Sequence, residues 1–323
     1  MSRRRVRFLA SALAGALASV VSLADPVQTV AAAAATGCDS ARPSVSAFYG
    51  PAASEIYDNA FHNAFAIPNL PAGYTPQGMT TWPLPNGSSL LILGEYKKKH
   101  DSLLVAIDPS TGHSYGTVKI AEAHLGGIAI VGNWLFAQDK PNTNHEKVRK
   151  YDMGKLAKAF LSSHNTGVYP YVGKTGALQP VYWASFMSSY GGHLYTGHHG
   201  IKDVLMYEYS VDSTGTLHKK HTYQSPPLTD GVVVTGDRFI FISHTDAPDT
   251  FGTMTITGRH AHLSDASIRC FAMPNLGEGT VLDHGTLYTA FESGSVGSHP
   301  TAADRINDVH GASYTLLSQL LGS

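Results

Sequence analysis

Polar and ionisable residues recur at the borders of apolar segments along this chain, and their types suit metal binding and proton transfer. One set stands just before an apolar segment: Gln77, His124, Tyr182, Asp230 and Glu278. A second set follows the next apolar segment in each case: Glu95, Asp139, His198 with His199, His244 and Glu292. A single residue of this kind is usually a solvated turn residue, but five recurrences favour a shared polar site.

Two chemistries fit these residue types. The candidate metal ligands are Asp139, Asp230 and Glu278. Carboxylates with backbone oxygens bind Ca²⁺ or Mg²⁺, whereas carboxylates mixed with His bind a transition metal such as Zn²⁺, Mn²⁺ or Fe²⁺. The candidate catalytic residues are His198, His244 and Glu292. Without a metal, a His and a carboxylate could serve as base and acid, because desolvation moves their pKa values toward neutrality. A third interpretation is a hydrogen-bonded plug without catalytic function.

The other border residues are candidates for ligand binding. They are Gln77, Glu95, His124, Tyr182, Trp183 and His199, of which the two aromatic residues could stack on a sugar or another flat ligand. The sequence contains no nucleophile elbow, no phosphate-binding loop and no dinucleotide fingerprint. The two sets of border residues meet only if the apolar segments converge on a common axis. The sequence leaves open whether the two sets lie at the same end of that axis.

The elements that would bring these residues together form a repeat of two short apolar strands joined by a Gly-, Asn- or Asp-containing turn. Five copies are anchored on Leu90, Leu135, Leu194, Phe239 and Leu287, with spacings of 45, 59, 45 and 48 residues. Periods of this length are typical of propeller blades. We therefore predict an all-β, five-bladed β-propeller over residues 76–300, with a sixth blade possible within 40–74 and a two-sheet sandwich as the rival fold.

Three segments with helical spacing interrupt this pattern. We expect a short helix within 53–65, in an N-terminal segment that spans 36–75. Residues 153–163 carry apolar residues at helical spacing and read as an insertion between blades, which explains the 59-residue interval. Residues 301–323 are expected to form a C-terminal helical tail.

The N-terminus has the pattern of an export signal. Four arginines in the first seven residues precede an apolar stretch, with small-residue cleavage sites near residues 24 and 35. We expect residues 1–35 to be a signal peptide of a secreted protein, and we expect no lipid anchor at Cys38. The apolar stretch is too short for stable membrane insertion.

The charge balance and the two cysteines complete these expectations. With 23 basic and 24 acidic residues, the formal net charge is −1, which gives no footprint for nucleic acid. Cys38 and Cys270 are the only cysteines, and in an exported chain two cysteines usually pair. Such a bridge would tie the two ends of the ring together. The expected state is a monomer with a small-molecule ligand.

Two phrases of the sequence support a resemblance. The segment from His124 to Asp139 and the segment from Glu278 to Gly294 resemble uncharacterised secreted proteins of actinobacteria. More distantly, the blade pattern resembles the propellers of gluconolactonases, paraoxonases and strictosidine-synthase-like proteins. That resemblance implies a divalent metal at the channel, although the ligand motif of those families does not match here residue by residue.

Taken together, these patterns predict a secreted propeller enzyme that acts on a small molecule in an axial pocket. The reaction would be a hydrolysis, elimination or cyclisation assisted by a metal ion or by His. The alternative is a secreted propeller that binds a glycan, lipid or protein without catalysis.

Overall fold

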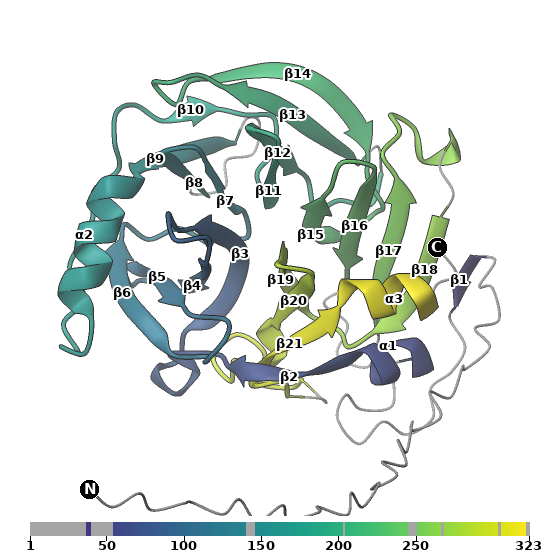
Figure 1. Ribbon diagram of the computed structural model, residues 1–323, viewed down its shortest axis with the longest axis horizontal. Coiled ribbons are helices and arrows are strands. Elements are labelled where there is room, and N and C mark those ends of the chain that lie inside the picture. Colours follow the sequence, from purple (N-terminus) through teal and green to yellow (C-terminus); the bar gives the residue numbers. More distant parts are fainter. Residues whose placement is uncertain are drawn as a thin grey trace, which may run out of the picture. The chain divides into compact units, whose positions relative to one another are not determined.

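Five β-sheets, antiparallel apart from one short edge strand, surround a central axis in the computed structural model, and Figure 1 views them nearly along that axis. The structure describes residues 37–39, 54–139, 146–202, 204–244, 251–265, 268–302 and 305–320, and the ring lies within the unit that spans residues 32–323. This arrangement confirms the five-bladed β-propeller, and the sandwich alternative is wrong. Among the described residues there is no sixth sheet.

The four inner strands of each blade follow one another in space from the central axis outward. The first comprises β3 (Thr75–Pro83), β4 (Ser89–Tyr96), β5 (Ser102–Ile107) and β6 (Ser114–Ile120). The second comprises β7 (Ile128–Val131), β8 (Trp134–Gln138), β9 (Lys147–Asp152) and β10 (Gln179–Pro180). The third comprises β11 (Phe186–Tyr190), β12 (His193–Gly197), β13 (Leu205–Val211) and β14 (Leu217–Gln224).

The last two blades take strands from both ends of the chain. The fourth comprises β15 (Thr229–Val234), β16 (Arg238–Ser243), β17 (Gly252–Gly258), β18 (Ile268–Met273) and β1 (Gly37–Asp39). The fifth comprises β19 (Gly277–Asp283), β20 (Thr286–Phe291), β21 (Asp308–Ser313) and β2 (Phe61–Ala66). The ring therefore extends beyond the expected limits of 76 and 300 at both ends, because β2 and β21 belong to a blade.

Pairing of β2 with β21 closes the ring by backbone hydrogen bonds, with Phe61 opposite Ala312. Closure of the ring therefore does not depend on the expected bridge between the chain ends. Strand β1 instead extends the fourth blade in parallel with β18, and its register sets Cys38 opposite Cys270. The disulfide between these two residues stays a prediction.

Tight turns fix the register of the innermost strands. The β11–β12 turn uses Gly191 and Gly192, both with positive φ, between the paired residues Tyr190 and His193. Two-residue turns of this kind match the twist of the strands that they join. This pairing places the start of each inner strand beside the end of the second strand of the same blade. The polar border residues at these two positions are therefore neighbours.

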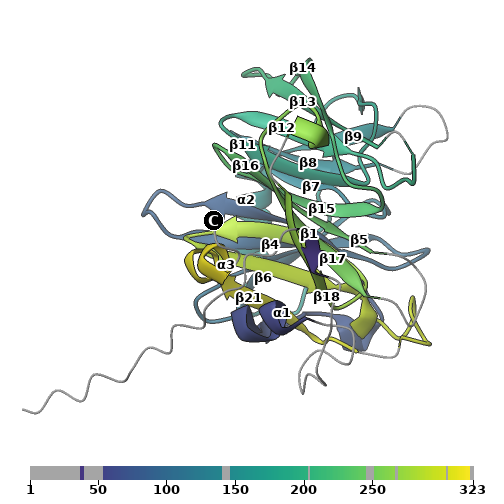
Figure 2. The ribbon, with the colours of Figure 1, turned by 90° about the vertical axis from the view of Figure 1, so that its right-hand side faces the viewer.

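Within the described ranges there are three short α-helices: α1 (Glu55–Ala60), α2 (Met153–Ser163) and α3 (Tyr314–Leu320). The Asp152 side chain caps α2 by accepting a hydrogen bond from the Lys155 backbone amide, and the helix packs on β6. Helix α3 contacts α1 and β21, as Figure 2 shows from the side. None of the described helices is both long and apolar enough to span a membrane.

Candidate metal centre

A polar pocket of about 470 Å³ lies where the inner strands begin. Neighbouring strands of a blade are antiparallel, so the residue before an inner strand lies beside the residue that ends the second strand. Both sets of border residues therefore share one end of the axis, which the sequence left open. The pocket is lined by Tyr96, His124, Gly126, Gln138, Glu146, Ser185, His199, Asp230, His244, Glu278, Glu292, Ser298 and His299.

Local irregularities in the inner strands aim three side chains at this region. The pairing register shifts around Gln77 in β3, around Asp230 in β15 and around Glu278 in β19. A β-bulge changes the direction of the side chain that it carries, and bulges are frequent beside active sites. The sequence pattern found these three residues without revealing the bulges.

Asp230, His244 and Glu278 form a buried group that could bind a metal ion. One ligand atom from each lies within 4.8 Å of the other two. His244 Nε2 is 3.0 Å from Asp230 Oδ2 and 3.3 Å from Glu278 Oε1. The three residues are only 5–7% exposed, and burial of two carboxylates with one His is costly unless they pair or coordinate a cation. The donor set suits a transition metal better than Ca²⁺, since imidazole is among its ligands.

His199 holds the first of these carboxylates from the other side. Its Nδ1 atom lies 2.6 Å from Asp230 Oδ1. Burial raises the pKa of Asp230, against the opposing effects of the His199 hydrogen bond and the His244 charge. A hydrogen bond on the second oxygen of a ligating carboxylate orients it toward the metal.

Glu292 is held by two donors on the same pocket wall. Gln77 Nε2 donates to one carboxylate oxygen, and His299 Nε2 lies 2.5 Å from the other. Burial raises the pKa of Glu292, but the His299 hydrogen bond and the charges of His299 and His124 outweigh it and hold the pKa below its usual range. The side chain is thus set up as an ionised carboxylate.

The second blade supplies a carboxyl group, Glu146, whose pKa is shifted in the opposite direction. Glu146 accepts a hydrogen bond from the Ala184 backbone amide and lies in the pocket with Gln138. Burial raises the pKa of Glu146, only partly offset by the hydrogen bonds from Ala184 and Gln138. The pocket therefore contains two carboxyl groups whose environments shift their pKa values in opposite directions.

Five of the predicted site residues lie away from this pocket. Glu95 is fully buried and accepts a hydrogen bond from Asn69 Nδ2 at 2.7 Å. Successive side chains of a strand point in opposite directions, and the preceding Gly94 lies against Leu125. Asp139 forms an ion pair with Arg149 and is not part of the Asp230 group.

The other three candidates, Tyr182, Trp183 and His198, take part in ring stacking outside the pocket lining. Trp183 packs on His198, with ring centroids 3.8 Å apart, and burial lowers the pKa of His198. Tyr182 is 46% exposed and stacks on Tyr207. Strand β11 begins later than expected, so Ser185 occupies the pocket position assigned to Tyr182.

The sequence pattern missed Gln138, Glu146, Ser185, Ser298 and His299. Glu146 precedes a third strand, and His299 lies in a loop after a short 3-10 turn, so neither borders an inner hairpin. Gln138 was available as a polar residue that ends β8, one position before Asp139.

Comparisons with known proteins give no family. No protein-family model matches the chain, and no curated protein matches it. Among solved structures, the glutaminyl cyclase of Myxococcus xanthus is similar at 8% identity, with a TM-score of 0.46, over 78% of this chain and 96% of that one. An identity of this size is no basis for transferring an activity. The resemblances drawn from the sequence have no support at the sequence level.

Proposed function

We propose that this protein is an extracellular enzyme that binds one divalent transition metal ion through Asp230, His244 and Glu278 and acts on a small molecule in the adjoining pocket. The observation that carries the proposal is the buried group of two carboxylates and one imidazole, with ligand atoms within 4.8 Å of one another. Three protein ligands leave a coordination position free, as catalytic metal sites require. The pocket of about 470 Å³ beside the group is large enough for a small ligand.

A cation bound there would polarise a carbonyl oxygen of the ligand or lower the pKa of a water molecule. The protein residues supply the rest of the chemistry. His199 fixes the direction of Asp230, which makes it a positioning residue. Glu292, oriented by Gln77 and His299, is the proposed base.

Glu146 is the proposed proton donor. It is buried in the same pocket, and its hydrogen bonds to the Ala184 amide and Gln138 fix its orientation. A pair of carboxyl groups with pKa values shifted apart is the usual arrangement for acid and base roles. These roles fit hydrolysis of an ester, lactone or amide, or the corresponding elimination or ring closure.

The metal site is tested by binding measurements on the full-length protein. After removal of metal with a chelator, Zn²⁺ and Mn²⁺ are titrated in separate experiments by isothermal calorimetry, and metal content is measured by mass spectrometry. One equivalent is expected to bind. His244→Ala and Glu278→Gln are expected to weaken binding by more than about 100-fold, since loss of even an indirect partner costs 10–100-fold.

The matched control is His218→Ala, which removes an exposed His that lies 3.3 Å from Asp212. This variant is expected to bind metal like the wild type. Circular dichroism establishes that each variant is folded. Absence of binding to the wild type, or unchanged binding in both pocket variants, would refute the metal site. Hydrolysis of a panel of chromogenic esters and amides that is lost on chelation and restored by the metal tests the enzyme assignment.

A further inference from the structure

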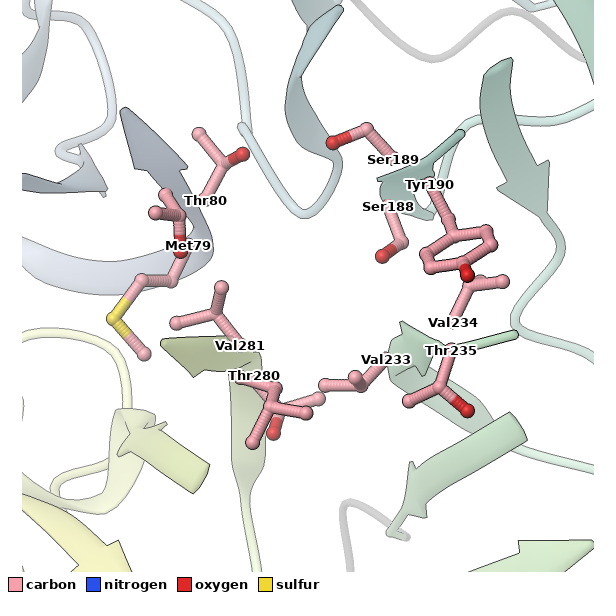
Figure 3. A pocket seen from close by; sticks show the side chains of 12 residues that line it. Met79, Thr80, Ser188, Ser189, Tyr190, Val233, Val234, Thr235, Thr280 and Val281 are labelled. Carbon is pink, nitrogen blue, oxygen red and sulfur yellow. The ribbon is translucent and has the colours of Figure 1, made fainter. Parts of the chain in front are cut away.

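A second cavity, of about 300 Å³, lies farther along the same inner strands (Figure 3). Residues from the later parts of β3, β11, β15 and β19 line it, whereas the metal pocket lies where these strands begin. The cavity residues are Met79, Thr80, Thr81, Ser188, Ser189, Tyr190, Val233, Val234, Thr235, Thr280, Val281 and Leu282. The two cavities therefore belong to different parts of the axis.

The chemistry of the lining changes from charged to apolar within three residues along β15 and β19. Asp230 faces the metal pocket, and Val233 on the same strand lines the second cavity. Glu278 and Val281 repeat this change in the fifth blade. Among the described residues, no Asp, Glu, His, Lys or Arg lines the second cavity. A charged ligand would lose hydration there, and the described lining residues would offer it no counter-ion.

The hydroxyl groups of the lining differ in their availability. Thr280 donates to the Tyr288 carbonyl, and Thr80 accepts from the Ile130 amide, so both are engaged within the protein. In contrast, none of the hydrogen bonds among the described residues uses the hydroxyl groups of Ser188 or Ser189. Strand β11 thus presents neighbouring hydroxyl groups that remain available to a ligand.

Aliphatic groups face these hydroxyls across the cavity. Figure 3 shows Ser188 of β11, Val233 of β15 and Val281 of β19 projecting into the enclosed space. Tyr190 adds an aromatic ring that is 41% exposed, and the Arg259 guanidinium lies 5.7 Å from the ring centroid. The cavity therefore combines free hydroxyls, an apolar wall and a partly exposed aromatic ring.

We propose that this cavity is a binding site for an uncharged monosaccharide. A pyranose has hydroxyl groups at its edge and an apolar C–H face, which correspond to the β11 hydroxyls and to the wall of Val233 and Val281. The volume is at the lower limit of known ligand pockets, which selects a single ring over an oligosaccharide. This site is independent of the proposed metal site and of its activity.

The test is a titration of the full-length protein with D-glucose, D-galactose and D-mannose, followed by saturation-transfer NMR and calorimetry. At least one of these sugars is expected to bind with a millimolar Kd or tighter. The double variant Ser188→Ala/Ser189→Ala is expected to weaken this binding about tenfold, because it removes two hydroxyl partners of the sugar. D-glucuronate and D-glucosamine are expected not to bind.

A cavity-filling pair of variants separates this site from the surface. Val281→Phe is expected to abolish binding, whereas the matched Val168→Phe, at a residue 68% exposed elsewhere, is expected to leave it unchanged. Glu278→Gln in the metal pocket is also expected to leave sugar binding unchanged. The proposal is overturned if none of the three sugars binds, if the folded Ser double variant binds as well as the wild type, or if the charged sugars bind equally well.

Discussion

Replacement of Glu95 by Gln is expected to stabilise the protein at neutral pH and to leave its stability unchanged in mild acid. Glu95 is fully buried in β4, and one of its oxygens accepts a hydrogen bond from Asn69 while the other has no hydrogen-bond partner among the described residues. Burial raises the pKa of Glu95 from 4.5 to about 8, although the Asn69 hydrogen bond opposes the shift. The folded protein therefore keeps this carboxyl protonated at pH values where the unfolded chain ionises it.

The size and sign of the effect follow from the linkage between protonation and folding. Between the two pKa values the folded state binds more protons than the unfolded state, so stability falls as the pH rises, by about 1.4 kcal/mol per unit. Neutral pH lies roughly two and a half units above the unfolded pKa, so the cost there is about 3 kcal/mol. Gln is neutral at every pH and has nearly the same shape, so Glu95→Gln avoids this cost.

Urea denaturation of both proteins from mild acid to pH 8 measures the prediction. The difference in the free energy of unfolding is expected to be near zero at pH 4.5 and to grow to about 3 kcal/mol at neutral pH, equivalent to a rise of about 6 °C in Tm. Glu55→Gln, at an exposed residue of α1, serves as the control and should show no such divergence. A stability difference that does not change with pH would refute the protonated state of Glu95.

Three further outcomes are expected. Burial lowers the pKa of His310 to about 3, so between this value and pH 6.5 only the unfolded state binds the proton. The free energy of unfolding should therefore fall by about 1.4 kcal/mol for each pH unit of acidification in this range. In thermal melts, His310→Gln should lose less stability per pH unit than the wild type. Gly279→Ala should destabilise the protein by about 1–3 kcal/mol in urea denaturation, because the added Cβ would lie 2.5 Å from the Gln77 carbonyl oxygen. Gly173→Ala is the control and should not destabilise the protein, because a Cβ there would have no neighbour within 4 Å. Peptide mapping without reductant should recover the peptides of Cys38 and Cys270 as one linked species, and reduction should cost about 2–4 kcal/mol in stability.

The sequence sufficed for the blades because each hairpin is a local structure. Two short apolar strands with a Gly-containing turn between them specify their own pairing, and their recurrence at intervals of 45 to 59 residues implies that the hairpins are arranged alike. The outermost strand of the fifth blade was not predictable in this way. Strand β2 pairs with β21, more than two hundred residues away, and nothing within the segment 61–66 indicates that partner.

The candidate site was predictable in its residue types and only partly in its membership. Asp230, His244 and Glu278 stand at equivalent borders of two adjacent blades, so the repeat pattern brought them together. Asp139 occupies such a border as well, but Arg149 on the neighbouring strand pairs with it. Which partner a carboxylate finds depends on side chains from other strands, which the periodicity of one strand does not describe.

The distribution of small residues explains why the pocket is open beside the metal ligands. In three blades the glycine after the border residue packs on a backbone carbonyl of the next blade: Gly78 on Gly126, Gly231 on Glu278, and Gly279 on Gln77. Gly126 thus occupies in the second blade the position that Glu278 occupies in the fifth, and Ser185 follows in the third blade. A Cβ at Gly126 would lie 2.4 Å from the Ser185 carbonyl oxygen, so close packing of the blades keeps this wall free of a side chain. The space that admits a ligand therefore results from the same contacts that hold the blades together, and a larger pocket would require the second and third blades to move apart.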